Sequence, residues 1–285
     1  MGSVKTVRVV CTQNLRKWAT DYRMWTIAAL LIVMIMLYVD DMQKIAARLG
    51  TKISIWIFPL LYTQAHTKLI FTLPVILMFC NAPFTDKNQV FVYTRITRAK
   101  WLSGQILYIF SASAVYYLFI FLLTIFTTFF IAEPSLEWGK LLNTAANSNV
   151  AQAVEANFVN IPRIILEYYT PVQATLLTFL TSWLSAVLLG LIVFLCNLVS
   201  GTRFLGIVAS SMLVVWTVLV AMGGWGDCMR FSPISWNTLN NIDVGYTTSN
   251  PTFGYCVSVY AGLIALLTAG IILGGKKKSL EVKER

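Results

Sequence analysis

The sequence predicts an all-α membrane protein with six transmembrane helices and both termini on the cytoplasmic side. Of its 285 residues, 57% are apolar and 12% are charged. Soluble domains average about 25% charged residues, so lipid is the expected solvent for most of the chain. The apolar residues gather in runs long enough to cross about 30 Å of hydrocarbon, and the basic residues concentrate beside one side of those runs.

The first element, residues 1–23, is predicted to be a basic amphipathic helix lying on the cytoplasmic leaflet. Apolar and aromatic side chains recur at helical spacing, at Val4, Val7, Cys11, Leu15, Trp18 and Tyr22. The basic residues Arg8, Arg16 and Lys17 fall mostly elsewhere on the helix, and Trp18 is suited to the headgroup layer. The alternative is an ordinary solvated leader before the first span.

The remaining elements follow from apolar runs and their breaks. The expected spans are residues 24–39, 69–85, 106–132, 171–199, 204–222 and 254–273. The segment 53–63 is apolar but has only 11 residues and contains Pro59, so we expect an interfacial or re-entrant piece on the outer side. Residues 86–105 form a basic cytoplasmic loop, and residues 133–170 and 223–253 form two outer segments.

The distribution of basic residues fixes the expected orientation. With the N-terminus inside, 15 of the 22 Lys and Arg residues lie on the inner side, as the positive-inside rule requires. Counting 53–63 as a seventh span would place Lys276, Lys277 and Lys278 outside, against that rule. The net charge of +10 is therefore read as orientation and lipid contact, and no nucleic-acid partner is expected.

The expected spans contain almost no ionised side chains. No charged residue lies in the central part of any expected span, and the single histidine, His66, lies at the start of one. This absence weighs against a proton-coupled carrier, a voltage sensor or a metal-dependent intramembrane enzyme. No catalytic group or metal site is expected, because no residues have the spacing of a catalytic triad and the five cysteines have no metal-binding spacing. No nucleotide motif is expected either, because Gly274–Ser279 lacks phosphate-loop spacing. A disulfide between Cys228 and Cys256 stays open.

One stretch of the sequence has a recognisable pattern. Residues 80–105 read CNAPFTDKNQVFVYTRITRAKWLSGQ, in which an Ala-Pro turn precedes an acidic residue, an extended segment and a basic-aromatic return to the membrane. This stretch, with the order of spans around it, resembles the ABC-2-type permeases, the membrane subunits of ABC exporters. The chain departs from the family at Asp86-Lys87-Asn88-Gln89, where an acidic residue followed by Gly-Thr is common.

The resemblance implies a transport function and a set of coupling residues. Coupling to a separate ATPase subunit would fall on Asp86, Arg95, Arg98, Lys100 and Trp101. From the residues alone, the preferred explanation is that these are positive-inside residues with an interfacial tryptophan. ATP and Mg²⁺ would bind the partner ATPase, so no cofactor is expected in this chain.

The implied assembly contains two nucleotide-binding subunits and a second permease subunit, identical or paralogous, in the cell membrane. A pathway without central charges favours export of an amphiphilic or hydrophobic cargo: a lipid-linked molecule, a peptide or a drug. The alternative from another class is a non-transport membrane scaffold or peptide-sensing subunit that acts through 133–170 and 223–253. A membrane enzyme is a third and weaker option, because no acid, base or metal constellation is present.

Overall fold

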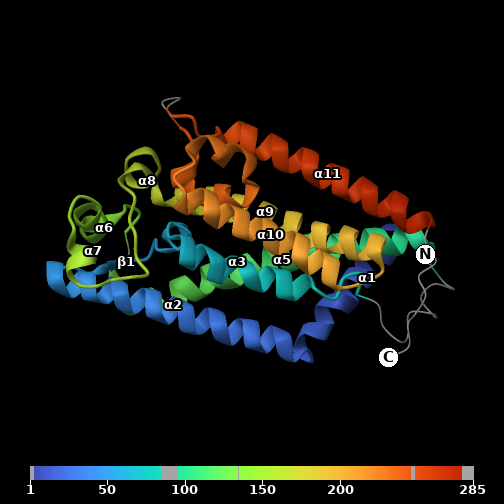
Figure 1. The fold of residues 1–285 in the computed structure, drawn as a ribbon. Coiled ribbons are helices and arrows are strands. Elements are labelled where there is room, and N and C mark those ends of the chain that lie inside the picture. Colours follow the sequence, from blue (N-terminus) through green and yellow to red (C-terminus); the bar gives the residue numbers. More distant parts are fainter. Residues whose placement is uncertain (1–2, 85–95, 134, 245–247, 278–285) are drawn as a thin grey trace.

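The computed structural model describes residues 3–84, 96–133, 135–244 and 248–277, which form a bundle of long helices (Figure 1). The long helices are α2 (Tyr22–Leu49), α3 (Ala65–Phe79), α5 (Arg98–Thr128), α9 (Pro171–Ser200), α10 (Phe204–Met222) and α11 (Phe253–Lys277). The shorter helices are α1 (Ser3–Arg16), η1 (Lys17–Ala19), η2 (Phe58–Leu60), α6 (Gly139–Ala146), α7 (Val150–Ala153), α8 (Arg163–Tyr168), η3 (Gly226–Phe231), η4 (Pro233–Asn237) and η5 (Leu239–Asn241). Two short strands, β1 (Ile53–Ser54) and β2 (Ala132–Glu133), pair in parallel.

Helix α9 is the centre of the bundle, and α3, α5, α10 and α11 all pack against it. Thr170 and Gln173 form a capping box at its start, with Pro171 at the first helical position. Gly201 ends it in the left-handed region, with φ of 75°. The close approach of neighbours to α9 explains Gly190, where a Cβ would lie 2.7 Å from Ile109 and 2.8 Å from Phe79.

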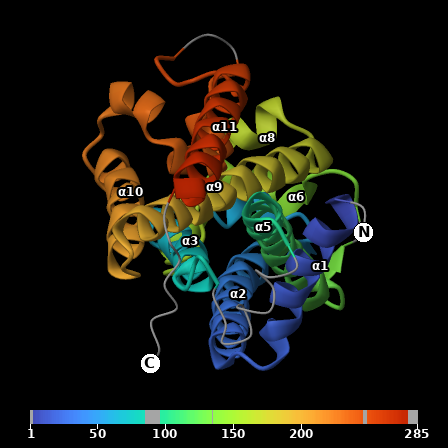
Figure 2. The same ribbon diagram turned by 90° about the vertical axis from the view of Figure 1, so that its right-hand side faces the viewer.

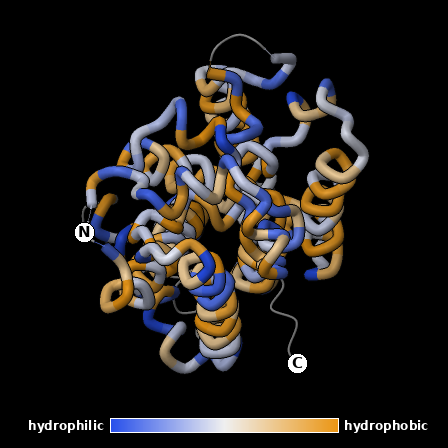
Figure 3. The backbone as a smooth tube through the Cα atoms, turned by 90° about the vertical axis from the view of Figure 1, so that its left-hand side faces the viewer, coloured by the Kyte–Doolittle hydropathy of each residue, from blue (hydrophilic) through white to orange (hydrophobic). Residues whose placement is uncertain are grey.

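The two ends of the bundle differ (Figures 1 and 2). One end, which we call the α1 end, holds α1, the start of α5, the link between α9 and α10, and the last turn of α11. The opposite end, the cap end, holds β1, β2, α6, α7, α8 and the three 3-10 helices η3, η4 and η5. Viewed from the cap end, hydrophilic segments lie over helices that are mostly apolar (Figure 3).

The structure agrees with the expectation of an all-α membrane protein, because it is mainly helical and its long helices are apolar. Five helices, α2, α5, α9, α10 and α11, are long and apolar enough to cross a membrane. Helix α3 has 15 residues and, at 1.5 Å per residue, reaches only about 22 Å. A sixth span therefore stays a prediction, as does the orientation of the termini.

Three boundaries differ from expectation. The expected span 24–39 lies in a helix that continues past Asp40 and Asp41 to Leu49, where Gly50 ends it with φ of 62°. The expected span 69–85 overlaps α3, which begins at Ala65 and ends at Phe79, before the turn that contains Pro83. The third long helix begins at Arg98, so the last eight residues of the expected loop 86–105 are helical.

The segment 53–63, expected to be an interfacial or re-entrant piece, is largely buried within the protein. It forms β1 and η2, and Ile57, Phe58, Leu60, Leu61 and Tyr62 are each at most 1% exposed. Aromatic contacts hold it from several sides, including ring pairs of Phe58 with Phe121 and of Tyr62 with Tyr117. This segment is part of the protein core, and its position relative to the membrane stays a prediction.

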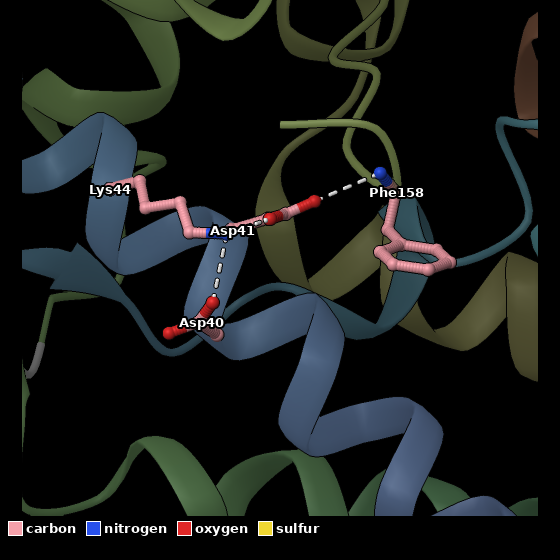
Figure 4. Close-up of polar contacts among 4 residues, drawn as sticks. All are labelled: Asp40, Asp41, Lys44 and Phe158. Carbon is pink, nitrogen blue, oxygen red and sulfur yellow. Dashed lines mark hydrogen bonds and ion pairs between the residues drawn. The ribbon is translucent and has the colours of Figure 1, made fainter. Parts of the chain in front are cut away.

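The part of α2 beyond Val39 makes polar contacts at the cap end (Figure 4). Asp41 is 4% exposed, and its carboxylate accepts a hydrogen bond of 3.0 Å from the backbone N–H of Phe158. Lys44 pairs with Asp41 and Asp40, each at 2.9 Å. The ion pair and the hydrogen bond offset the cost of burying the Asp41 carboxylate in this part of the helix.

Candidate functional site

The α1 end is rich in positive charge. Helix α1, η1, the start of α2, the first turn of α5 and the α9–α10 link together carry eight described basic residues: Lys5, Arg8, Arg16, Lys17, Arg23, Arg98, Lys100 and Arg203. The same segments carry one described acidic residue, Asp21, which caps α2 through the backbone N–H of Arg23. Such an excess attracts anionic lipid headgroups or an acidic protein surface.

Helix α1 is docked along the first turns of α5, as the end-on view shows (Figure 2). Asn14 Nδ2 donates to Gln105 Oε1 at 2.7 Å, and both residues are buried. Trp18 Nε1 donates to the Tyr108 hydroxyl at 2.9 Å. Gly104 permits the close approach, because a Cβ there would lie 2.6 Å from Val10 Cβ.

The turn that follows α3 is fixed to α9 and to two arginines. Asn197 Nδ2 donates to the carbonyls of Ala82 at 2.9 Å and Cys80 at 3.3 Å. Its Oδ1 accepts the backbone N–H of Gly206 at 2.9 Å. One buried amide of α9 therefore ties together the 80–84 turn and the start of α10.

The arginines complete this attachment. Arg23 donates to Cys80 Sγ at 3.2 Å, and Arg203 donates to Asn81 Oδ1 at 3.3 Å. Phe84, at the end of the turn, packs edge-on against Tyr108 with ring centroids 4.8 Å apart. A force applied to this turn would therefore be transmitted to α2, α5 and the α9–α10 link together.

The expected coupling residues are placed as follows. Asp86 and Arg95 lie outside the described residues. Arg98 and Lys100 are half-buried in the first turn of α5. Trp101 is 2% exposed, so its ring is inside the protein rather than at the surface position expected of a membrane anchor.

The expected interfacial residues of α1 divide into two groups. Arg8 and Arg16 are exposed, whereas Lys17 and Trp18 are half-buried. Lys17 donates to Asn14 Oδ1 at 3.0 Å. The buried side chains Val10, Cys11 and Asn14 face α5, so this part of the helix packs on protein, and contact of the rest with lipid stays a prediction.

Sequence reasoning missed Asn14, Gln105, Asn197 and Gly206 as parts of this end. A lone amide within an apolar run, as at Asn197, is the signal that could have indicated a helix-helix or helix-turn contact. Within the described ranges, no group of three or more His, Cys, Asp or Glu residues is arranged to hold a metal ion. Cys228 and Cys256 are free thiols.

The fold and this end define the class of the molecule as a multi-pass α-helical membrane protein with one strongly basic end. No protein-family model matches the chain, and no curated protein matches it.

Proposed function

We propose that the chain is the permease subunit of an ATP-driven transporter, with ATP hydrolysed by a separate subunit that docks at the α1 end. The single observation that carries the proposal is the docking of α1 on α5 beside the basic first turn of α5. A subunit bound to that surface would move α1 and α5 together, because a buried amide pair and a tryptophan-tyrosine hydrogen bond join them.

The assembly in this proposal follows the resemblance of residues 80–105 to the ABC-2-type permeases. Two permease subunits, identical or paralogous, would sit in the cell membrane above two nucleotide-binding subunits with both termini in the cytoplasm. The cargo would be amphiphilic or hydrophobic and would be exported. ATP and Mg²⁺ would be held by the partner subunits, and the chain itself would catalyse no reaction.

Affinity purification from native membranes tests the proposal. The tagged chain is solubilised in a mild detergent, and its co-purifying proteins are identified and assayed for Mg²⁺-dependent ATP hydrolysis. We expect an ATPase with the wild-type chain and its loss when Arg98 and Lys100 are both replaced by Glu. The matched control replaces Lys52, an exposed lysine at the cap end, by Glu and should retain the ATPase.

A second candidate function is peptide recognition by a non-transport subunit, and one feature of the cap end favours it. A hollow of about 600 Å³ opens between Gln64 and the segment 145–161. Its lining is mostly polar, with amide side chains from Gln64, Asn149, Gln152, Asn157 and Asn160. Purification of the wild-type chain without any ATPase, together with saturable peptide binding at this hollow, would favour this function over transport.

A further inference from the structure

Two arginines from different helices meet at the turn that follows α3. Arg23 lies in the first turn of α2, and its guanidinium donates to Cys80 Sγ at 3.2 Å. Arg203 directly precedes α10, and its guanidinium donates to Oδ1 of the next residue along the turn, Asn81, at 3.3 Å. Both positive charges also act electrostatically on the Cys80 thiol. Two guanidinium groups are therefore held beside adjacent residues where α3 ends.

The two guanidinium groups have capacity left to bind an anion. Arginine stays ionised at physiological pH, and its guanidinium carries five N–H donors. The ion pairs between described residues include neither arginine. Asp21, whose carboxylate caps α2 through the backbone N–H of Arg23, supplies one negative charge nearby. The pair of arginines therefore keeps an excess of positive charge over the described residues around it.

An exposed apolar strip of α3 leads to these arginines. Leu73 and Leu77 are 41% and 55% exposed, whereas residues 74–76 and 78–79 are buried. Their spacing of four residues places both leucines on one face of the helix. Cys80 comes three residues after Leu77 and still has helical backbone angles, with φ of −57° and ψ of −27°, so it continues the same face. The apolar strip therefore ends at the residue that Arg23 contacts.

Helices α2 and α10 lie on either side of α3 (Figures 1 and 2). Both pack against α3, and both begin at the α1 end, where Arg23 and Arg203 lie. Two longer helices thus flank the exposed strip, and each brings one arginine to its end. A hydrocarbon chain that follows the strip from Leu73 to Leu77 would carry an attached head group to the two guanidinium groups.

We propose that Arg23 and Arg203 bind the phosphate of an anionic phospholipid, one acyl chain of which lies along Leu73 and Leu77. Arginine and phosphate form charge-assisted, frequently bidentate hydrogen bonds. The excess of positive charge favours a head group with net negative charge over a zwitterionic one. The exposed leucines favour a lipid over a free phosphate, which has no apolar part to cover them. Binding needs no ATPase partner, so this site is independent of the proposed function.

Native mass spectrometry of the purified full-length chain in a neutral detergent tests the site. The probes are phosphatidylglycerol and phosphatidylcholine with the same acyl chains, and glycerol 3-phosphate, which has the phosphate without acyl chains. We expect phosphatidylglycerol to bind about tenfold more tightly than phosphatidylcholine, and glycerol 3-phosphate not to bind at the same concentrations. Equal affinity for the two lipids, or binding of glycerol 3-phosphate as tight as that of phosphatidylglycerol, would overturn the assignment to an anionic phospholipid.

Variants separate this pair of arginines from the general positive charge of the α1 end. Arg23→Gln and Arg203→Gln should each weaken binding of phosphatidylglycerol about tenfold and leave binding of phosphatidylcholine unchanged, which also shows that the variants are folded. Arg203→Lys keeps the charge and should retain more affinity than Arg203→Gln. Arg8→Gln, which removes an exposed arginine of the same end, is the matched control and should bind like the wild type. Unchanged affinity in both glutamine variants at positions 23 and 203, or an equal loss in Arg8→Gln, would overturn the site.

A phosphatidylglycerol with a photoreactive group on its acyl chain locates the chain. Crosslinks mapped by mass spectrometry are expected at Leu73 and Leu77 and should be lost when Arg23 and Arg203 are both replaced by Gln. Crosslinks confined to helices other than α2, α3 and α10 would contradict the placement of the lipid. Neither result would affect co-purification of an ATPase, which tests the proposed function separately.

Discussion

Asn14 and Gln105 form a buried side-chain hydrogen bond of 2.7 Å between residues 91 positions apart. This contact fixes the register of α1 on α5. Replacing Asn14 by Leu leaves the Gln105 carbonyl oxygen buried without that donor, which costs about 1–3 kcal/mol. We expect α1 to detach more often and Cys11, now 5% exposed, to react faster with a maleimide, as measured by peptide mass mapping.

The matched control for this prediction is the double variant Asn14→Leu with Gln105→Leu. Replacing both partners by apolar groups of similar size avoids the unsatisfied oxygen and should restore much of the protection of Cys11. Unchanged labelling of Cys11 in Asn14→Leu would show that the amide pair does not hold α1 in place.

Gly206 is predicted to be essential for the contact between α9 and α10. A Cβ at this position would lie 2.6 Å from the Val193 carbonyl and would also overlap the Asn197 amide. Gly206→Ala should therefore destabilise the protein by about 1–3 kcal/mol, measured by thermal unfolding in detergent. Gly262→Ala, in α11, is the control, because a Cβ there meets nothing within 4 Å; an equally stable Gly206→Ala would refute the packing.

These positions show what the sequence could and could not predict. Transfer free energy places apolar helices well, and α9 and α10 cover 171–200 and 204–222, close to the expected ranges. The continuation of α2 past Asp41 could not be predicted, because its hydrogen-bond partner, the N–H of Phe158, lies 117 residues away.

The burial of Trp101 and the link between Asn197 and the 80–84 turn were missed for the same reason. Each depends on a contact between segments distant in sequence, and periodicity within one helix carries no information on its partner. The basic character of the α1 end, in contrast, was predictable, because charges beside apolar runs are read directly from the sequence. Asp86 and Arg95 were expected at this end as well, and their part in coupling stays a prediction.

Asp41 is predicted to hold the segment 133–170 against α2. Asp41→Leu removes both the acceptor for the Phe158 N–H and the partner of Lys44. We expect faster trypsin cleavage after Lys140 or Arg163 in the folded protein, because the segment opens more often. Asp40→Leu is the control, since the Asp40 side chain is 59% exposed and makes a weak surface pair. Equal cleavage rates in the two variants would argue against this role.

The orientation of the bundle is predicted to place the α1 end in the cytoplasm. Arg8 and Lys52 are exposed at opposite ends of the bundle, and each can be replaced by Cys. In sealed right-side-out vesicles, a membrane-impermeant maleimide should label Lys52→Cys and leave Arg8→Cys unmodified until the vesicles are opened. Peptide mass mapping distinguishes these positions from the five natural cysteines. The opposite pattern would reverse the orientation.

The central claim is that a separate ATPase docks at the α1 end. Photocrosslinking in native membranes tests it most directly, with a photoreactive amino acid placed at Arg8, at Lys100 or, as the control, at Lys52. We predict that an ATP-binding protein is crosslinked from positions 8 and 100 and not from position 52, as identified by mass spectrometry. Adducts to an ATP-binding protein from position 52 alone, or from none of the three positions, would contradict the account.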